Sequence, residues 1–145
     1  EAIITTNLLG PIRLTAGLLP HLKAQPAATL MTVTSGLAFI PLTATPTYNA
    51  TKAALHSWTI SLRDQLRDSA VEVLELAPPG VATDLIPGHA DNPASMPLAD
   101  YIAEVMSLIE GGDTPRGEIL VERVKPLRQA ESSGAWDQVF AKLNR

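Results

Sequence analysis

Apolar residues recur at helical spacing in four segments of the chain. In residues 1–24 and 46–69 they return every three or four positions, which is typical of a helix that buries one face. A Gly-Pro pair at residues 10–11 interrupts the first of these segments. Because proline has no backbone N–H, we expect a kink or a break in the helical hydrogen bonds there. Shorter helices are predicted over residues 97–110 and 135–143.

Three runs rich in β-branched and other apolar residues lie between these helices and predict strands over 29–35, 71–77 and 118–122. Strands that alternate with helices in this way form parallel sheets with helices on both faces, so the predicted fold class is α/β. Ligands bind such sheets beyond the carboxyl ends of the strands. In this chain those positions hold Ser35 and the Pro78-Pro79-Gly80 turn.

The segment from residue 78 to residue 97 is long and irregular, with turn-forming pairs at 87–88 and 92–93. Loops of this length in a compact domain are usually functional. We therefore expect this segment to shape a binding site, with His89 on its surface.

Composition narrows the function classes. With 145 residues the chain has the size of one domain, and 46% hydrophobic residues are enough to form a core. The net charge of −4 provides no basic patch for nucleic acid and no run of like charge for a membrane surface. No apolar run in the sequence approaches the ~20 residues of a membrane span, and no signal peptide is recognisable. We expect a cytoplasmic protein that binds neither nucleic acid nor membrane.

Residue types that bind metals or form disulfides are scarce. The chain has no cysteine, which excludes disulfide bonds and thiolate chemistry. Its three histidines, His21, His56 and His89, lie far apart, and none has a metal-ligating partner at helical spacing. No metal site is predicted.

Tyr48 and Lys52 form the most informative pair in the sequence. They follow Pro46, which is suited to the first turn of a helix, and are four residues apart, so both side chains leave the same helix face. An ammonium beside a phenol favours the phenolate electrostatically, so this tyrosine can give or take a proton near neutral pH. Such a pair also arises by chance, so its meaning depends on the residues around it.

The order and spacing of five polar residues resemble the short-chain dehydrogenase/reductase family. Members of that family carry Asn, Ser and Tyr-x-x-x-Lys in this order, followed by a threonine after a proline-rich turn. Taken singly, each of these residues is an ordinary turn or helix residue, and only their joint spacing is specific. The matching positions are Asn7, Ser35, Tyr48, Lys52 and Thr83.

The resemblance runs along the whole chain, but only to the second half of the family's domain. It is most specific at residues 35–41 and 48–55, and residues 75–79 and 120–125 resemble a bacterial oxidoreductase branch. It implies the C-terminal half of a Rossmann-like doubly wound parallel sheet, with three strands and flanking helices. Residues 1–145 would then be a single partial domain, the catalytic half.

The resemblance also implies roles for the four catalytic positions. Tyr48 would be the general acid that protonates a carbonyl oxygen as hydride arrives, or the base in the reverse direction. Lys52 would favour the ionised phenol and bond the nicotinamide ribose. Ser35 would hold the substrate oxygen, and Asn7 would keep a water-linked proton path to Lys52. The substrate would be a small carbonyl compound or alcohol.

The cofactor implied by the resemblance is NAD or NADP. Besides Tyr48 and Lys52, the turn that contains Pro78, Val81 and Thr83 would contact it, with Val81 and Thr83 at the nicotinamide amide. The family turn has the pattern Pro-Gly-x-Val-x-Thr, and here Pro79 stands in place of the glycine. Because proline lacks an N–H and has a fixed φ, the fit around the nicotinamide ring is altered.

A phosphate-binding loop is absent from these residues. No Gly-x-x-x-Gly-x-Gly motif occurs, and the first strands of the family's sheet are missing, so the nucleotide-binding half is not present. We expect the isolated chain to lack dehydrogenase activity. Strand 29–35 would also lack its usual neighbour. We expect a second copy or a rearranged segment to cover its open edge, or else the edge to open onto solvent channels with disorder nearby.

Two other functions stay open at this point. The first is a non-catalytic fragment that acts as a helix-mediated dimerisation module, because the family commonly forms homo-oligomers through the helices that correspond to 1–24 and 46–69. The second is an epimerase or dehydratase of the extended branch of the same superfamily, which keeps the Tyr/Lys pair. The short segment after Glu122 argues against this second alternative, since those enzymes carry a larger substrate domain.

Overall fold

The computed structural model describes residues 1–85, 88 and 90–145. Its centre is a three-stranded parallel sheet in the order β1-β2-β3. Strand β1 pairs with β2 along its whole length, in a register that ends at Val33 opposite Leu76. The predicted α/β class and the parallel sheet are confirmed. The strands are β1 (Ala28–Val33), β2 (Val71–Leu76) and β3 (Glu118–Ile119).

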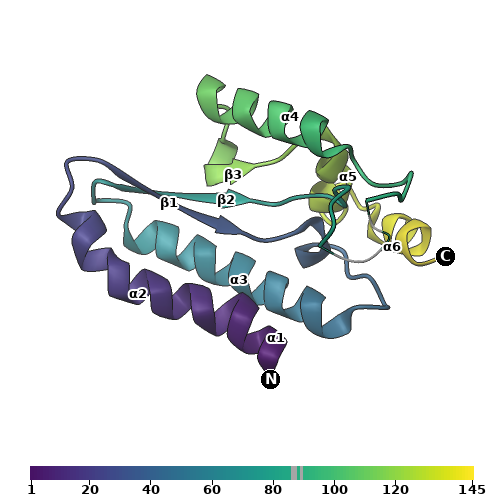
Figure 1. The fold of residues 1–145 in the computed structure, drawn as a ribbon, viewed down its shortest axis with the longest axis horizontal. Helices are drawn as coiled ribbons and strands as arrows, with labels where there is room; N and C mark the ends of the chain where they lie inside the picture. The colour runs from purple at the N-terminus through teal and green to yellow at the C-terminus, as the bar shows by residue number, and fades with distance from the viewer. Residues whose placement is uncertain (86–87, 89) are drawn as a thin grey trace.

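Helices cover both faces of the sheet (Figure 1). The N-terminal helix and α3 lie on one face, and α4 lies on the other. The carboxyl ends of the strands, the start of α3 and the two C-terminal helices gather at one end of the molecule (Figure 1). The helices are α1 (Ala2–Ile4), η1 (Thr5–Leu9), α2 (Gly10–Lys23), η2 (Gly36–Ala38), α3 (Pro46–Gln65), α4 (Leu98–Gly111), η3 (Pro115–Gly117), η4 (Glu122–Val124), α5 (Lys125–Gln129) and α6 (Trp136–Asn144).

The hydrogen-bond ladder of the first helix changes where the sequence predicts a break. Residues Thr5–Leu9 form a π-helical turn, in which the Gly10 N–H donates to the Thr5 carbonyl. Pro11 has no N–H to offer to the carbonyl of Asn7, four residues earlier, so regular α-helical bonding cannot continue there. The chain stays helical across this point, and α1, η1 and α2 form one rod.

Apolar side chains fill two clusters, one on each face of the sheet. Under α3 the buried members are Leu62, Leu66, Val71 and Val73. Under α4 they are Leu74, Met96, Val105, Ile119, Val121 and Val124. Because β2 contributes to both clusters, it is the strand that is covered on both faces, as expected for the centre of a parallel sheet.

The C-terminal part differs from the sequence-based prediction. The strand expected over 118–122 has two residues, Glu118–Ile119. Lys125 and Pro126 begin the short helix α5. Proline is tolerated in a first helical turn because the N–H it lacks would have no partner there. Pro87 and His89, which the sequence places in the long loop, lie outside the described residues.

The N-terminal helix also corrects an expectation from composition. From Ala2 to Lys23 it has 22 residues with a mean hydropathy of 1.3, long and apolar enough to cross a membrane by these two measures alone. One such helix is weak evidence for a membrane span, because core helices of soluble proteins pass the same test. Its α1 and η1 parts pack against α3, and it retains exposed apolar side chains at Ile4, Leu14 and Leu18.

Strand β1 is an open edge of the sheet, as predicted. Two of its apolar side chains are exposed, Met31 at 39% and Val33 at 48%. The rearranged segment that was expected to cover this edge is not found among the described residues, where β2 is the strand that pairs with β1. Coverage by a second copy stays a prediction.

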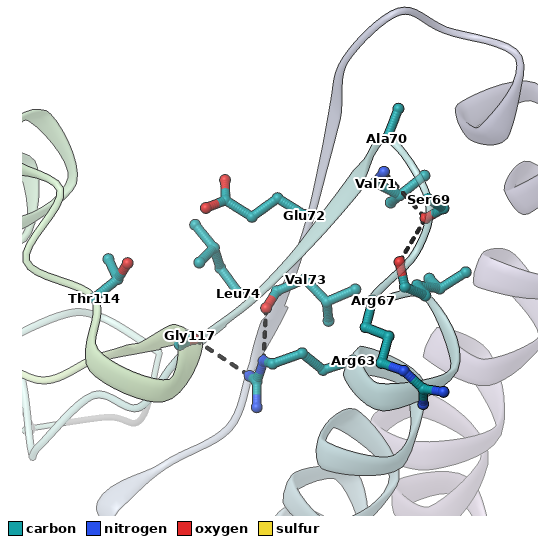
Figure 2. Close-up of a pocket in the computed structure, with 11 residues that line it drawn as sticks. Arg63, Arg67, Ser69, Ala70, Val71, Glu72, Val73, Leu74, Thr114 and Gly117 are labelled. Carbon is teal, nitrogen blue, oxygen red and sulfur yellow. Dashed lines mark hydrogen bonds between the residues drawn. The ribbon is translucent and has the colours of Figure 1, made fainter.

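Arg63 links β2 to the turn that contains Gly117. Arg63 donates from Nε to the Val73 carbonyl at 2.8 Å and from Nη2 to the Gly117 carbonyl at 3.3 Å (Figure 2). Gly117 has φ +72°, and a Cβ added there would meet the Arg63 guanidinium and lie 2.8 Å from the Val73 oxygen. This position therefore excludes side chains both by conformation and by space.

We predict that Gly117→Ala lowers the free energy of unfolding by about 2–4 kcal/mol, from the left-handed backbone and the clash with backbone oxygen. The matched control is Gly111→Ala. Gly111 ends α4 with open space around its Cα, so alanine there should leave stability unchanged or raise it by up to about 1 kcal/mol. Urea unfolding of both variants tests this, and equal stability of the two would contradict it.

Candidate active site

Lys52 lies between the start of α3 and the end of β1. Its Nζ is 5.6 Å from the centroid of the Tyr48 ring and donates a hydrogen bond of 2.9 Å to the Val33 carbonyl. Val33 is two residues before Ser35. The ammonium therefore faces the phenol, as the spacing of the two residues predicts, and ties the helix that carries both of them to the strand that leads to Ser35.

Burial makes this position unfavourable for a charge. Removal from water lowers the pKa of Lys52 below its ordinary value of 10.5. Groups held in their charged form at such a cost are often functional, and here the specific partner is a tyrosine ring. The arrangement can place a cation beside a phenol that gains or loses a proton.

The second tyrosine has a different environment. The Tyr101 hydroxyl is buried without a hydrogen-bond partner in the described part of the chain, and burial raises the pKa of Tyr101 to about 12. A phenol with that pKa exchanges protons poorly near neutral pH. Of the two tyrosines, Tyr48 is therefore the candidate acid or base.

Asn7 contacts the same helix through one intermediate residue. Its Nδ2 donates to Thr51 Oγ1 at 3.2 Å, and Thr51 Oγ1 donates to the Tyr48 carbonyl at 2.7 Å. Asn7 sits in the π-helical turn η1, at the point where Pro11 removes a helical hydrogen bond. The predicted residue thus lies beside the Tyr48 helix, and its bond to Thr51 was not predicted from the sequence.

Ser35 and the proline-rich turn lie side by side at the carboxyl end of the sheet. Ser35 is 8% exposed, and its Oγ accepts a hydrogen bond from the Leu37 N–H at 3.1 Å. The next residue, Gly36, donates its N–H to the Pro78 carbonyl at 2.8 Å. Because β1 and β2 are parallel and in register, the two segments that follow them meet at one edge, as predicted.

The turn after β2 contains one residue, Val81, whose backbone groups are not used in the bridge to Met96. Val81 forms an isolated parallel bridge with Met96, through the Ala82 N–H to Met96 O and the Met96 N–H to Gly80 O, both 2.8 Å. In a parallel bridge of this type the central residue uses neither of its own backbone groups. The N–H and C=O of Val81 are therefore directed to the opposite side of the segment. Thr83 follows it, partly buried.

Comparison with known proteins identifies the family. The profile of the short chain dehydrogenase family matches residues 1–93. The chain belongs to the short-chain dehydrogenase family. It is 41% identical to the uncharacterized oxidoreductase DltE of Bacillus subtilis, over 97% of this chain and 56% of that protein.

Solved structures show the same fold. A short-chain dehydrogenase from Burkholderia cenocepacia, in complex with NADP, superposes with a TM-score of 0.80 at 21% identity, over 97% of this chain and 58% of that one. A relative from Burkholderia phymatum, in complex with NAD, superposes with a TM-score of 0.54 at 19% identity, over 97% and 54%. This short-chain dehydrogenase chain therefore spans slightly more than half the length of these relatives.

The loop between Ser35 and Tyr48 is held from two sides in this short-chain dehydrogenase. From α3, the buried Asn49 donates to the Leu42 carbonyl at 2.7 Å. From α6, Asn144 accepts from the Thr43 N–H at 2.7 Å and donates to the Pro41 carbonyl at 3.1 Å. The C-terminal helix thus fixes the loop that precedes the tyrosine. Sequence reasoning missed Asn144, because no local pattern indicates a contact 101 residues away.

Sequence reasoning also missed a buried acidic cluster next to the site. Glu75, on β2, is 0% exposed and binds His56 and Thr34. Beside it, Glu118 receives two bonds of 2.9 Å from Arg128. A signal was present: Glu72 and Glu75 are three residues apart in a strand, so they point to opposite faces, and on a central strand at least one faces a covering layer.

This cluster has the composition of a metal site but a different bonding pattern. One ligand atom each of His56, Glu75 and Glu118 lie within 4.8 Å of one another. However, His56 Nδ1 is bonded to Glu75, and both Glu118 oxygens are bonded to the Arg128 guanidinium. A metal ion would have to displace a cation that is already in place, so the arrangement favours an ion-pair cluster over metal binding.

A cavity of about 440 Å³ lies away from these residues. Its lining includes Arg63, Arg67 and the start of β2, at the amino end of the strand (Figure 2). In open α/β sheets ligands bind at the opposite, carboxyl end. None of the predicted site residues lines it, and we assign the candidate site to the Tyr48 end on the basis of geometry.

The buried Glu75 predicts acid sensitivity of the fold. Burial alone raises the pKa of this carboxyl, but hydrogen bonds from His56 and Thr34 and the nearby Arg63 charge more than offset it, so the pKa lies below 4.5. A carboxyl with a lowered pKa in the folded state stabilises the fold above pH 4.5, and this contribution is lost as the pH falls below that value.

We predict that Glu75→Gln lowers the free energy of unfolding by about 1–3 kcal/mol at pH 7, and that the difference from the parent narrows as the pH drops below 4.5. Urea unfolding at pH 7 and pH 3 measures both values. The matched control is Glu72→Gln on the exposed side of the same strand, with an expected change within about 0.5 kcal/mol. A pH-independent difference for Glu75→Gln would contradict the prediction.

Proposed function

We propose that this chain is the catalytic half of an NAD(P)-dependent oxidoreductase that interconverts a small carbonyl compound and its alcohol. The observation that carries the proposal is the half-buried Lys52 ammonium, which faces the Tyr48 ring and bonds the end of β1. Membership of the short-chain dehydrogenase family, shown by the match to residues 1–93, supports it. The NADP and NAD complexes of two structural relatives support a nicotinamide cofactor.

In the proposed mechanism Tyr48 exchanges the proton. In the reducing direction its O–H donates to the carbonyl oxygen as negative charge develops there, and in the oxidising direction the phenolate takes the alcohol proton. Lys52 stabilises the phenolate through its charge. Ser35 holds the substrate oxygen by a hydrogen bond, and Asn7 supports the proton path by way of the Tyr48 helix. The nicotinamide cofactor, when bound, supplies or accepts the hydride.

The residues of the chain fit one end of such a cofactor. Lys52 has further N–H donors besides the one directed at Val33, and these can bond ribose hydroxyls. The Val81 backbone N–H and C=O, which face away from Met96, can bond a carboxamide, with Pro78 and Thr83 beside them. The pyrophosphate has no Gly-rich loop in these 145 residues. We therefore propose that its binding site comes from a separate segment, and that the isolated chain is inactive.

Substitution of the Tyr/Lys pair tests this function. The chain is assayed alone and fused behind the N-terminal part of DltE, by following NADH and NADPH absorbance with a panel of aldehydes and ketones. We expect turnover only in the fusion. Tyr48→Phe and Lys52→Met should each lower kcat of the fusion at least about 100-fold, since proton transfer at this step contributes that much or more.

The matched control for these variants is Tyr101→Phe, which removes the other phenol hydroxyl and should retain kcat within about 3-fold. Circular dichroism confirms that each variant is folded. Full activity of folded Tyr48→Phe would sink the proposed mechanism, and turnover by the chain alone would refute the proposal that it needs a second segment.

We propose that the protein associates with itself through the outer faces of the N-terminal helix and α3. Apolar side chains at Ile4, Leu14, Leu18 and Ile60 are 42%, 65%, 46% and 47% exposed on these helices. Exposed apolar side chains on neighbouring helices support association. The same surface favours the second candidate function, a non-catalytic dimerisation module, which cofactor titration distinguishes: a stable dimer indifferent to NADH and NADPH supports it.

We predict that Leu14→Glu combined with Leu18→Glu converts a dimer to a monomer, because it would bury uncompensated charges in the interface. Light scattering coupled to size-exclusion chromatography gives the mass. Leu85→Glu is the control, since Leu85 is 86% exposed outside these helices and should leave the mass unchanged. A parent chain that is monomeric at about 100 μM counts against the proposal, because this concentration is well above the dissociation constants of stable homodimers.

A further inference from the structure

One buried carboxylate joins the two elements that carry the candidate catalytic residues. Glu75 Oε1 accepts a hydrogen bond of 2.6 Å from the Thr34 hydroxyl. The same carboxylate meets His56 Nδ1 at 2.8 Å and 2.9 Å. Thr34 immediately precedes Ser35, and His56 follows Lys52 by four residues on the same face of α3. Glu75 itself sits on β2, between these two elements.

The surroundings hold this carboxylate rigidly. The His56 and Phe39 rings pack edge to face, with 5.0 Å between their centroids, and the Arg128 guanidinium carbon lies over the Phe39 ring, 5.0 Å from its centroid. Arg128 in turn holds Glu118, which is 3% exposed. Arg63 contributes a further positive charge near Glu75. Carboxylates from β2 and β3 thus face cations and donors from α3, α5 and β1.

A charge in such a position is costly unless all of its bonds are made, so its neighbours have little freedom to move. A shift of α3 along β1 would break the bond from His56 or the bond from Thr34. The Lys52 bond to the Val33 carbonyl spans the same two elements one turn away. Carboxylate and ammonium therefore fix the same relative position of helix and strand.

We propose that Glu75, with His56 and Thr34 as its donors, is a positioning group that sets Lys52 and Tyr48 against Ser35. This inference rests on the proposed function for its catalytic consequence, but its geometric part concerns this chain alone. Glu75 touches none of the proposed reacting atoms. It acts through the two segments that it holds together, which distinguishes it from the catalytic residues.

The burial of Lys52 offers a readout that needs no activity. Because desolvation lowers the Lys52 pKa, release of α3 from β1 should let water reach the ammonium and move that pKa up toward 10.5. Loss of the Glu75 negative charge by itself acts in the opposite direction, since a nearby anion favours the ammonium. A purely structural role would lower stability and leave the Lys52 titration of the folded chain unchanged.

The experiment follows the Lys52 side chain of the 145-residue chain by NMR titration, with Lys52→Arg to assign its signal. In Glu75→Gln and in Thr34→Val we expect the Lys52 pKa to rise toward 10.5, whereas Thr34→Ser, which keeps the hydroxyl, should restore the parent value. The matched control is Glu72→Gln, because Glu72 also accepts a bond from a threonine of β1, Thr29 at 3.3 Å, but at an exposed position. An unchanged Lys52 titration in folded Thr34→Val overturns the proposal.

The catalytic consequence is measured in the fusion with the DltE segment. We expect Thr34→Val to lower kcat about 10-fold with KM for the nicotinamide within about 2-fold, because misplacement of a catalytic group affects the transition state most. Thr34→Ser should rescue kcat. If the parent fusion is inactive, the proposed function fails while the titration still decides the positioning role. A titration that shifts with no change in kcat would overturn the catalytic part of the proposal.

Discussion

The structure depends on the desolvated charge of Glu75. A carboxylate that is fully buried in the central strand must keep every hydrogen bond, and its donors are Thr34, directly after β1, and His56 of α3. These two elements could otherwise slide past each other, because the apolar contacts between a helix and a sheet are not directional. The polar contact is directional, so it selects one register from among many that would bury a similar apolar area. The neighbouring Glu118–Arg128 pair extends the same constraint to α5.

The candidate active site uses the precision that this core provides. Lys52 is held where burial disfavours its charge, in return for one backbone hydrogen bond and the face of a tyrosine ring. Such a position is poor for stability, since an apolar side chain would lose less on burial. In the proposed mechanism it would favour proton exchange at Tyr48, because the field of a poorly solvated cation is weakly screened. The residue type that favours the proposed chemistry at position 52 is therefore not the one that would stabilise the fold most. The hydrogen bonds of the nearby Glu75 hold the same helix and strand together.

The exposed apolar surfaces of the chain are consistent with its covering only part of the length of its short-chain dehydrogenase relatives. The open edge of β1 lies where a fuller sheet would continue, and two apolar side chains of this strand, Met31 and Val33, are exposed. The outer face of the N-terminal helix is apolar as well, and it is long enough to resemble a membrane span by composition. Both features follow if these elements contact further protein, either another segment or a second copy. The loop between Ser35 and Tyr48, by contrast, is held by hydrogen bonds to Asn144 and Asn49.

Local patterns determined much of this protein. A period of about 3.6 located the long helices, and runs of β-branched and apolar residues located the strands β1 and β2. The spacing of Tyr48 and Lys52 placed both side chains on one helix face, because these features depend on neighbours in sequence. Their joint spacing with Asn7, Ser35 and Thr83 also identified the family. Only the tertiary structure showed that β3 has two residues, that Lys125 begins a helix, and that Glu75 meets His56 and Thr34. The Glu75 contacts join residues that are 19 and 41 positions apart in the sequence, and no local pattern encodes contacts over such distances. Burial also changes the energy of the Glu75 charge, and burial is set by the tertiary structure.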